Sequence, residues 1–203
     1  MTSLKYQCQK CGTCCHEIPE CSGAKRIPLY PEEVDRLIEV AKERGIEFKV
    51  IEDLVFPDLN NNKILVITYK IILDNETKGC PFYNKESGCS VHEIKPFACQ
   101  AYPLSLKNID AFNYELTIDP LCNFVIANRE EIKLDVDMEK IKRIFIDEFP
   151  KAENFFKKNK KLMFKIRKLE AENKIRIARK ISLEDFNKAL KEWDREEIIA
   201  GME

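Results

Sequence analysis

The stretch Cys8-Gln9-Lys10-Cys11-Gly12-Thr13-Cys14-Cys15 places four thiols within eight residues and governs how the rest of the chain is interpreted. Single cysteines are often buried as small apolar residues, but burial alone does not explain this density. Two residues between thiols allow one tight turn to direct both sulfurs at a common ion. Gly12 permits a positive φ directly after the second cysteine. The stretch therefore predicts metal binding.

The spacing of these thiols fits two kinds of metal site. Cys-x-x-Cys-Gly is compatible with a zinc knuckle, whereas Cys14 completes the Cys-x-x-Cys-x-x-Cys tripod that wraps a 4Fe-4S cluster. Ferredoxins often add a distant Cys-Pro, a role for which Cys80-Pro81 is a candidate. The tripod favours an iron–sulfur cluster, and zinc stays open. Because neighbouring side chains are expected to diverge, Cys14 and Cys15 are predicted to serve two sites, or one site and a nearby reactive thiol.

Further cysteines follow at positions 80, 89, 99 and 122. With the first four they make eight thiols, enough for two zinc ions, two clusters or one of each. Cys21 is left over. The only histidines, His16 and His92, are each close to a cysteine. A ligand role is open for both, but a surface or hydrogen-bonded imidazole is the favoured interpretation.

Composition sets limits on the class of protein. The 203 residues carry 34 basic and 35 acidic side chains, and 44% of the residues are hydrophobic. These values favour a packed fold and argue against a dedicated nucleic-acid binder. The sequence has no secretory signal and no apolar run near the roughly 20 residues that span a bilayer. We therefore expect a cytoplasmic protein with no membrane partner, whose clustered thiols bind metal rather than form disulfides. A composition rich in Lys, Glu and Ile hints at a thermophile, which keeps disulfides open.

Patterning along the chain predicts an α+β fold. Residues 31–44 carry apolar side chains at helical spacing, between Pro31 at the first helical position and Gly45 past the end. The β-rich segments 48–56 and 63–73 flank a run of asparagines and predict a hairpin.

The remaining segments are predicted in less detail. Residues 114–118 predict a short strand. The irregular segment 79–103 is expected to be a cysteine-rich region that metal orders. A helical C-terminal tail follows, with a capping box beginning at Ser182. We expect a cysteine-cluster domain over residues 1–130 and a helical extension over 131–203.

The cysteine pattern resembles the CxxCxxCC cysteine-cluster family of zinc- or iron-chelating domains. The likeness rests on Tyr6-x-Cys-x-x-Cys-Gly-x-Cys-Cys15, on Ile27-Pro-Leu-Tyr-Pro-Glu-Glu-Val34 and on the segment Cys80-Pro-Phe-Tyr through Cys99-Gln-Ala-Tyr-Pro103. It covers roughly residues 6–122. The resemblance implies a metal-ligand set of Cys8, Cys11, Cys14, Cys15, Cys80, Cys89, Cys99 and Cys122.

Two departures from the family pattern affect what the resemblance implies. Members commonly have Arg-Pro and Cys-Arg where this chain has Lys95-Pro96 and Cys99-Gln100. An activity that needs the guanidinium fork is therefore in doubt. Flagellin lysine N-methylases carry a similar cluster, which raises the hypothesis of a protein-modifying enzyme, although no methyl-donor motif is found.

The main interpretation is a metal-binding protein whose thiols chelate iron–sulfur clusters or zinc, with an electron-transfer or cluster-assisted role. Residues 157–180 form a strongly basic stretch, so an RNA- or protein-interaction module is a further hypothesis. A solvated helix face is the favoured interpretation of that stretch.

Overall fold

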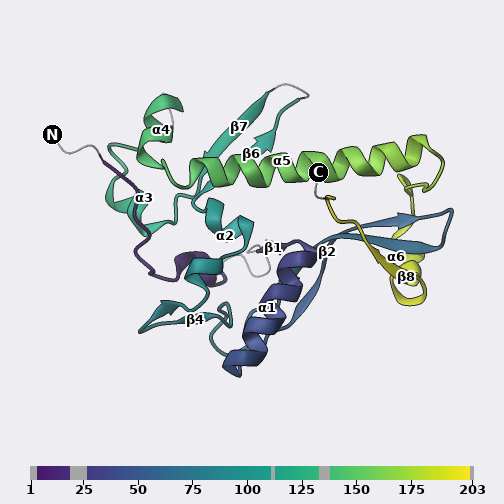
Figure 1. Cartoon of the computed structure of the whole chain (residues 1–203), viewed down its shortest axis with the longest axis horizontal. Helices are drawn as coiled ribbons and strands as arrows, with labels where there is room; N and C mark the ends of the chain where they lie inside the picture. The colour runs from purple at the N-terminus through teal and green to yellow at the C-terminus, as the bar shows by residue number, and fades with distance from the viewer. Residues whose placement is uncertain (1–3, 19–26, 111–112, 133–137, 202–203) are drawn as a thin grey trace. The chain divides into compact units, whose positions relative to one another are not determined.

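The computed structural model describes residues 4–18, 27–110, 113–132 and 138–201 (Figure 1). The chain packs as two compact units, each made of two separate segments. Unit 1 contains residues 1–27 and 73–157, and unit 2 contains residues 28–72 and 158–203. A compact packing unit is not necessarily a domain that folds independently. The domain boundary expected near residue 130 therefore stays a prediction.

Unit 2 is built on the predicted β-hairpin, which is confirmed. Strands β2 (Val50–Asp58) and β3 (Lys63–Ile71) pair antiparallel from Val50 opposite Ile71 to Asp58 opposite Lys63. On its other edge β3 pairs with β1 (Pro28–Leu29). The centre of β3 is apolar and fully buried, so this strand forms the core of the unit.

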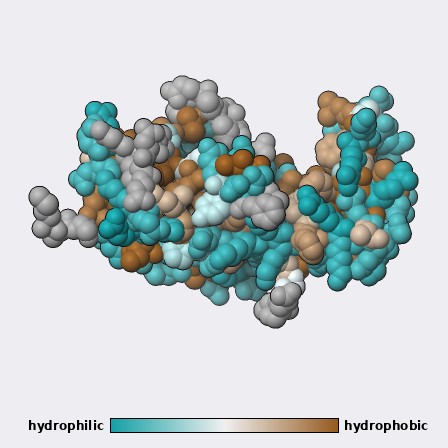
Figure 2. Space-filling view, turned by 90° about the horizontal axis from the view of Figure 1, so that it is seen from above, coloured by the Kyte–Doolittle hydropathy of each residue, from teal (hydrophilic) through white to brown (hydrophobic). Residues whose placement is uncertain are grey.

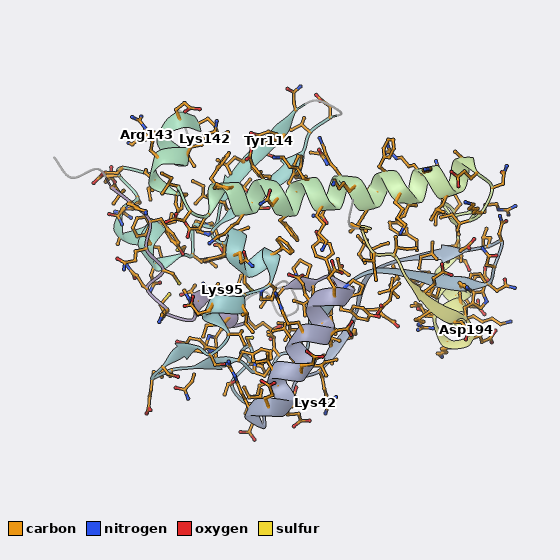
Figure 3. All side chains as sticks on the ribbon, viewed as in Figure 1. Lys42, Lys95, Tyr114, Lys142, Arg143 and Asp194 are labelled. Carbon is orange, nitrogen blue, oxygen red and sulfur yellow. The ribbon has the colours of Figure 1, made fainter. Side chains whose placement is uncertain are left out.

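Helix α1 (Pro31–Arg44) has the predicted boundaries. The backbone N–H of Tyr30 donates to the buried Glu33 carboxylate at 2.9 Å, which closes a capping box at the first turn. Gly45 ends the helix with a φ of 64°. Lys42 lies in the last turn, where its positive charge interacts favourably with the negative end of the helix dipole (Figure 3).

The C-terminal tail is helical as predicted, in α4 (Met138–Ile144), α5 (Phe149–Ala171) and α6 (Leu183–Glu192). Ser182 caps α6, because its hydroxyl accepts from the Asp185 N–H at 3.0 Å. Ala189 of α6 is buried against the sheet.

One strand of the tail was not predicted. Residues Asp194–Glu197 form β8, which pairs parallel with β3 beside Lys63–Val66. All four side chains are exposed and charged, so no alternation of apolar and polar residues marks the strand in the sequence. Backbone pairing with the free edge of β3 determines its conformation.

Unit 1 combines short elements around an aromatic core. It contains the strand pairs β4 (Tyr83–Asn84) with β5 (Gly88–Cys89) and β6 (Leu104–Asn108) with β7 (Tyr114–Ile118). Its short helices are η1 (Thr13–Cys15), η2 (His92–Ile94), α2 (Phe97–Ala101) and α3 (Asn123–Ala127). In its core the ring of Tyr6 packs against Phe124 and Phe145, with centroids 5.0 and 5.2 Å away.

The mixture of helices and small, mostly antiparallel sheets confirms the α+β class. Within the described residues, no helix combines the length and apolarity needed to cross a membrane. Figure 2 shows a face on which hydrophilic residues predominate and hydrophobic ones form separate patches.

Candidate metal centre

All eight candidate ligands lie in unit 1, and none of them forms a disulfide with another described cysteine, whereas Cys21 lies outside the described residues. The first four lie on a tight turn that ends in η1. Lys10 and Gly12 have positive φ values of 52° and 81°. The Cys15 N–H then donates to the Gly12 carbonyl at 2.7 Å. The glycine predicted to allow this reversal of the chain therefore does so.

A short antiparallel backbone pairing brings Cys80 to this turn. The Cys80 N–H donates to the Cys15 carbonyl at 2.7 Å, and the Glu17 N–H donates to the Lys78 carbonyl at 2.8 Å. His16 and Gly79 form the bridge between these two bonds. Backbone hydrogen bonds between segments that are far apart in sequence thus bring Cys80 close to the first cysteine group.

The β4–β5 hairpin places Cys89 opposite Tyr83. The side chain of Tyr83 lies over the first turn, since a Cβ on Gly12 would be 2.3 Å from the Tyr83 Cζ. On the hairpin, Gly88 has a φ of 79° and lies against the Lys10 side chain. Close packing between the turn and the hairpin thus fixes their arrangement.

Two short helices carry the last two candidate cysteines. Cys99 lies within α2, and Cys122 is the N-cap residue of α3. The Cys11 sulfur is 3.3 Å from the Thr13 hydroxyl, which donates to the side-chain oxygen of Asn123 at 3.3 Å. This chain of contacts joins the first turn to the start of α3.

Backbone N–H groups near three thiols favour the thiolate form. They belong to Phe82 for Cys80, to Val91 for Cys89, and to Phe124 and Val125 for Cys122, and each lowers the pKa of its cysteine. Hydrogen bonds of this kind tune metal–thiolate centres. In each case a donor lies two residues after the cysteine, in a turn or at a helix N-terminus.

Burial and mutual repulsion nevertheless raise the pKa of the thiols. Burial raises the pKa of Cys80 to about 11, with a contribution from the neighbouring Cys89 and Cys14 thiolates. The pKa of Cys99 is well above its usual value because of burial, followed by repulsion from the Cys14, Cys80 and Cys89 thiolates. A bound cation would offset this repulsion, so the donor set fits a thiolate-binding metal.

Cys14 and Cys15 are in contact, with their sulfurs 3.7 Å apart, so the expectation of diverging side chains is wrong. Both residues belong to one 3-10 turn, which does not send neighbouring side chains to opposite sides as a strand would. The hydrogen bond between the two thiols, followed by burial, raises the pKa of Cys15.

The Cys14 thiolate raises the pKa of groups other than Cys80 and Cys99. It raises the pKa of Cys89 and of Tyr6, in each case after a larger effect of burial. Among the described side chains, no group of three or more His, Cys, Asp or Glu is already arranged to hold a metal ion. The structure therefore gathers the sulfurs into one neighbourhood without closing a coordination shell.

Lys95, which precedes α2, is a functional candidate that the cysteine pattern does not identify (Figure 3). Its ammonium lowers the pKa of Cys89 and Cys99. The Gln100 side-chain amide donates to the Lys95 carbonyl at 2.6 Å. The two positions that depart from the family pattern are thus in contact.

The two histidines differ. His16 Nδ1 is 2.9 Å from the Gly12 carbonyl, and its ring meets Tyr83 edge-on, so this imidazole is hydrogen-bonded. His92 Nδ1 is 3.5 Å from a Glu93 oxygen. Its Nε2 is buried and lacks a hydrogen-bond partner among the described residues. Burial, the largest cause, lowers the pKa of His92.

Unit 1 holds eight cysteines, with Cys14 in contact with Cys15 and Cys80 paired to Cys15 through the backbone, and this fits a cysteine-rich metal-chelating domain. The chain belongs to the CxxCxxCC family, described as "Putative zinc- or iron-chelating domain", whose sequence model matches residues 7–123. This match covers more than half of the chain and includes every candidate cysteine. No curated protein and no solved structure is found to match the chain.

Proposed function

We propose that this chelating domain holds iron–sulfur clusters of the 4Fe-4S type and serves electron transfer or cluster-assisted chemistry in the cytoplasm. The observation that carries the proposal is the convergence of a Cys-x-x-Cys-x-x-Cys turn with four distant thiols in one unit. A tripod of this spacing is typical of cubane clusters.

We assign the first ligand set to Cys8, Cys11, Cys14 and Cys122, so that Cys122 takes the fourth position for which Cys80-Pro81 was the candidate from sequence. The electrostatic environment of Tyr6 supports the grouping, because the Cys8, Cys122 and Cys14 thiolates all raise its pKa after burial. The Cys11 thiolate raises the pKa of Cys122 in the same way. Thr13 and Asn123 link the Cys11 turn to the helix that begins after Cys122.

The second set contains Cys15, Cys80, Cys89 and Cys99. Support comes from the backbone hydrogen bond between Cys15 and Cys80. Cys80 and Cys89 also both repel Cys15 and Cys99, in addition to a larger repulsion from Cys14 of the first set. Contact between Cys14 and Cys15 makes the two sets adjacent.

A bound cluster would supply one-electron redox chemistry. The protein contributes the thiolates, the N–H groups beside Cys80, Cys89 and Cys122, and the charge of Lys95. These groups favour the anionic form of the thiolate ligands.

The test is anaerobic purification of the full chain, followed by visible absorption and by measurement of iron, acid-labile sulfide and zinc. We expect a brown protein that contains iron and sulfide. A colourless protein with stoichiometric zinc would overturn the iron–sulfur assignment and leave a zinc-chelating domain.

Single replacements test the two sets. Cys122→Ser removes one ligand from the first set, and Cys99→Ser one from the second, so each variant should lose about half of the iron. The double variant should lose nearly all of it. If either single variant loses all the iron while its circular dichroism is unchanged, the thiols form one site and the division is wrong.

A further inference from the structure

The part of α5 that lies in unit 2 carries an exposed face that the chelating role does not use. Lys160, Lys161, Arg167 and Lys168 surround Phe164 at three and four residues on either side, and all five residues are exposed. This spacing places them on one face of the helix. One pair of cations lies about 5 Å before the aromatic ring along the helix axis and the other about 5 Å after it.

Phe164 is not a core residue. Its exposed fraction is 72%, whereas Leu162 and Ile166 on the other side of the helix are 1% and 3% exposed. The core-facing side of α5 is therefore already filled without it. The ring is therefore exposed on the cationic face, where a planar ligand can reach it.

The helix segment that carries this face has no acidic side chain of its own, and the two glutamates that follow it have basic partners. Residues 157–169 contain no Asp or Glu. Glu170 pairs with Arg179 at 3.1 Å, and Glu172 pairs with Lys174 at 2.7 Å and lies 4.0 Å from Lys168. The helix segment itself therefore contributes only positive charge to this exposed face, although Lys168 lies near Glu172 and Lys160 and Lys161 also have interaction partners. The net charge of the whole chain is −1.

We propose that this face binds single-stranded nucleic acid, with phosphates at the four cations and a base stacked on Phe164. Proteins that bind single strands without sequence preference combine an aromatic ring, on which a base stacks, with cations that bind the phosphate backbone of the nucleic acid. An anionic membrane fits less well, because a membrane-bound helix inserts a broad apolar face and that of α5 is buried.

The probe is a fluorescein-labelled single-stranded RNA of about 12 nucleotides, and binding to the metal-loaded full chain is followed by fluorescence anisotropy. Four phosphate contacts predict that affinity falls about 50-fold between about 50 and about 200 mM salt. Phe164→Ala should weaken binding at least about fivefold, and Phe164→Trp should retain it. Leu183→Ala removes an apolar side chain that is 75% exposed elsewhere in the unit, so it should have no effect.

Charge reversal supplies a matched comparison. Arg167→Glu with Lys168→Glu should abolish binding, whereas Lys188→Glu with Lys191→Glu makes the same change of net charge on the exposed side of α6 and should leave affinity within about threefold. Equal losses in the two double variants would overturn the proposal. No RNA binding at the lower salt concentration would also overturn it, as would binding to phosphatidylserine vesicles instead of RNA.

Discussion

Gly12 is the described glycine at which an added side chain would be most crowded. It combines a φ of 81° with the closest approach of a side chain, that of Tyr83, to any glycine described. Gly45 offers a natural comparison, since it also has a positive φ, at 64°, but has open space around it. The two positions separate backbone strain from steric exclusion.

Gly12→Ala is therefore expected to displace Tyr83 and the turn beneath it, and to reduce bound metal to less than about half. Gly45→Ala introduces only left-handed strain, about 1 kcal/mol, and should retain full metal content. Metal analysis and thermal unfolding of both variants check the prediction. Equal metal content in both would show that the contact with Tyr83 does not matter.

Lys95 acts on the thiols through its charge. Lys95→Met should raise the pKa of Cys89 and Cys99, because the ammonium now lowers both values. Since a metal displaces thiol protons, zinc affinity should then fall most at low pH and recover as pH rises.

Zinc competition with a chelator across a pH series measures this effect, and the curve should shift toward higher pH. Lys95→Arg keeps the charge and should give a curve close to that of the natural chain. Lys107→Met removes a lysine on β6 that is exposed and should leave the curve unchanged. A curve for Lys95→Met that matches this control would contradict the prediction.

At the scale of elements, one buried carboxylate secures the turn of the β2–β3 hairpin. Asp58 is fully buried and accepts from the Asn60 N–H at 3.0 Å and the Arg176 N–H at 2.8 Å. Asn61 also donates to it at 2.5 Å. Asp58 thus joins the hairpin to the segment that follows α5.

Asp58→Ala should destabilise the protein by about 2–4 kcal/mol, because buried donors lose their acceptor. Asp58→Asn keeps one acceptor oxygen and should cost less. Denaturant unfolding measures both, with the exposed Asp35→Ala as the control, for which we expect less than about 0.5 kcal/mol. An alanine variant as stable as this control would refute the role of Asp58.

At the scale of the whole molecule, the two units depend on different sources of order. Unit 2 contains a buried strand whose residues Ile64–Ile67 are at most 1% exposed. Unit 1 builds its metal centre from two-residue strands and one-turn helices, whose order is expected to depend on bound metal.

Removal of metal by a chelator under reducing conditions should therefore loosen unit 1 selectively. Hydrogen exchange is expected to speed up at the amides of Cys80, Tyr83 and Ser90, while the β2–β3 amides stay protected. Uniform loss of protection, or none, would contradict the dependence of unit 1 on metal.

The extent to which the sequence predicts this structure depends on how local the signals are. Helix α1 was predicted to its end residues, because periodicity, Pro31 and Gly45 lie within one segment. Strand β8 was missed, because its conformation is determined by pairing with β3 and not by a pattern in its own sequence. The contact of Cys14 with Cys15 was also missed, because it depends on the rotation of a 3-10 turn.

The sequence by itself determined that this protein is a thiol-rich chelator of the α+β class, because ligand type, spacing and hydrophobic periodicity are local properties of the chain. Only the tertiary structure decided which thiols become neighbours, that Lys95 acts on them, and that Tyr83 covers the turn at Gly12. The physical reason is that these relations depend on backbone pairing between segments far apart in sequence, such as that of Cys15 with Cys80. No local pattern encodes such pairing.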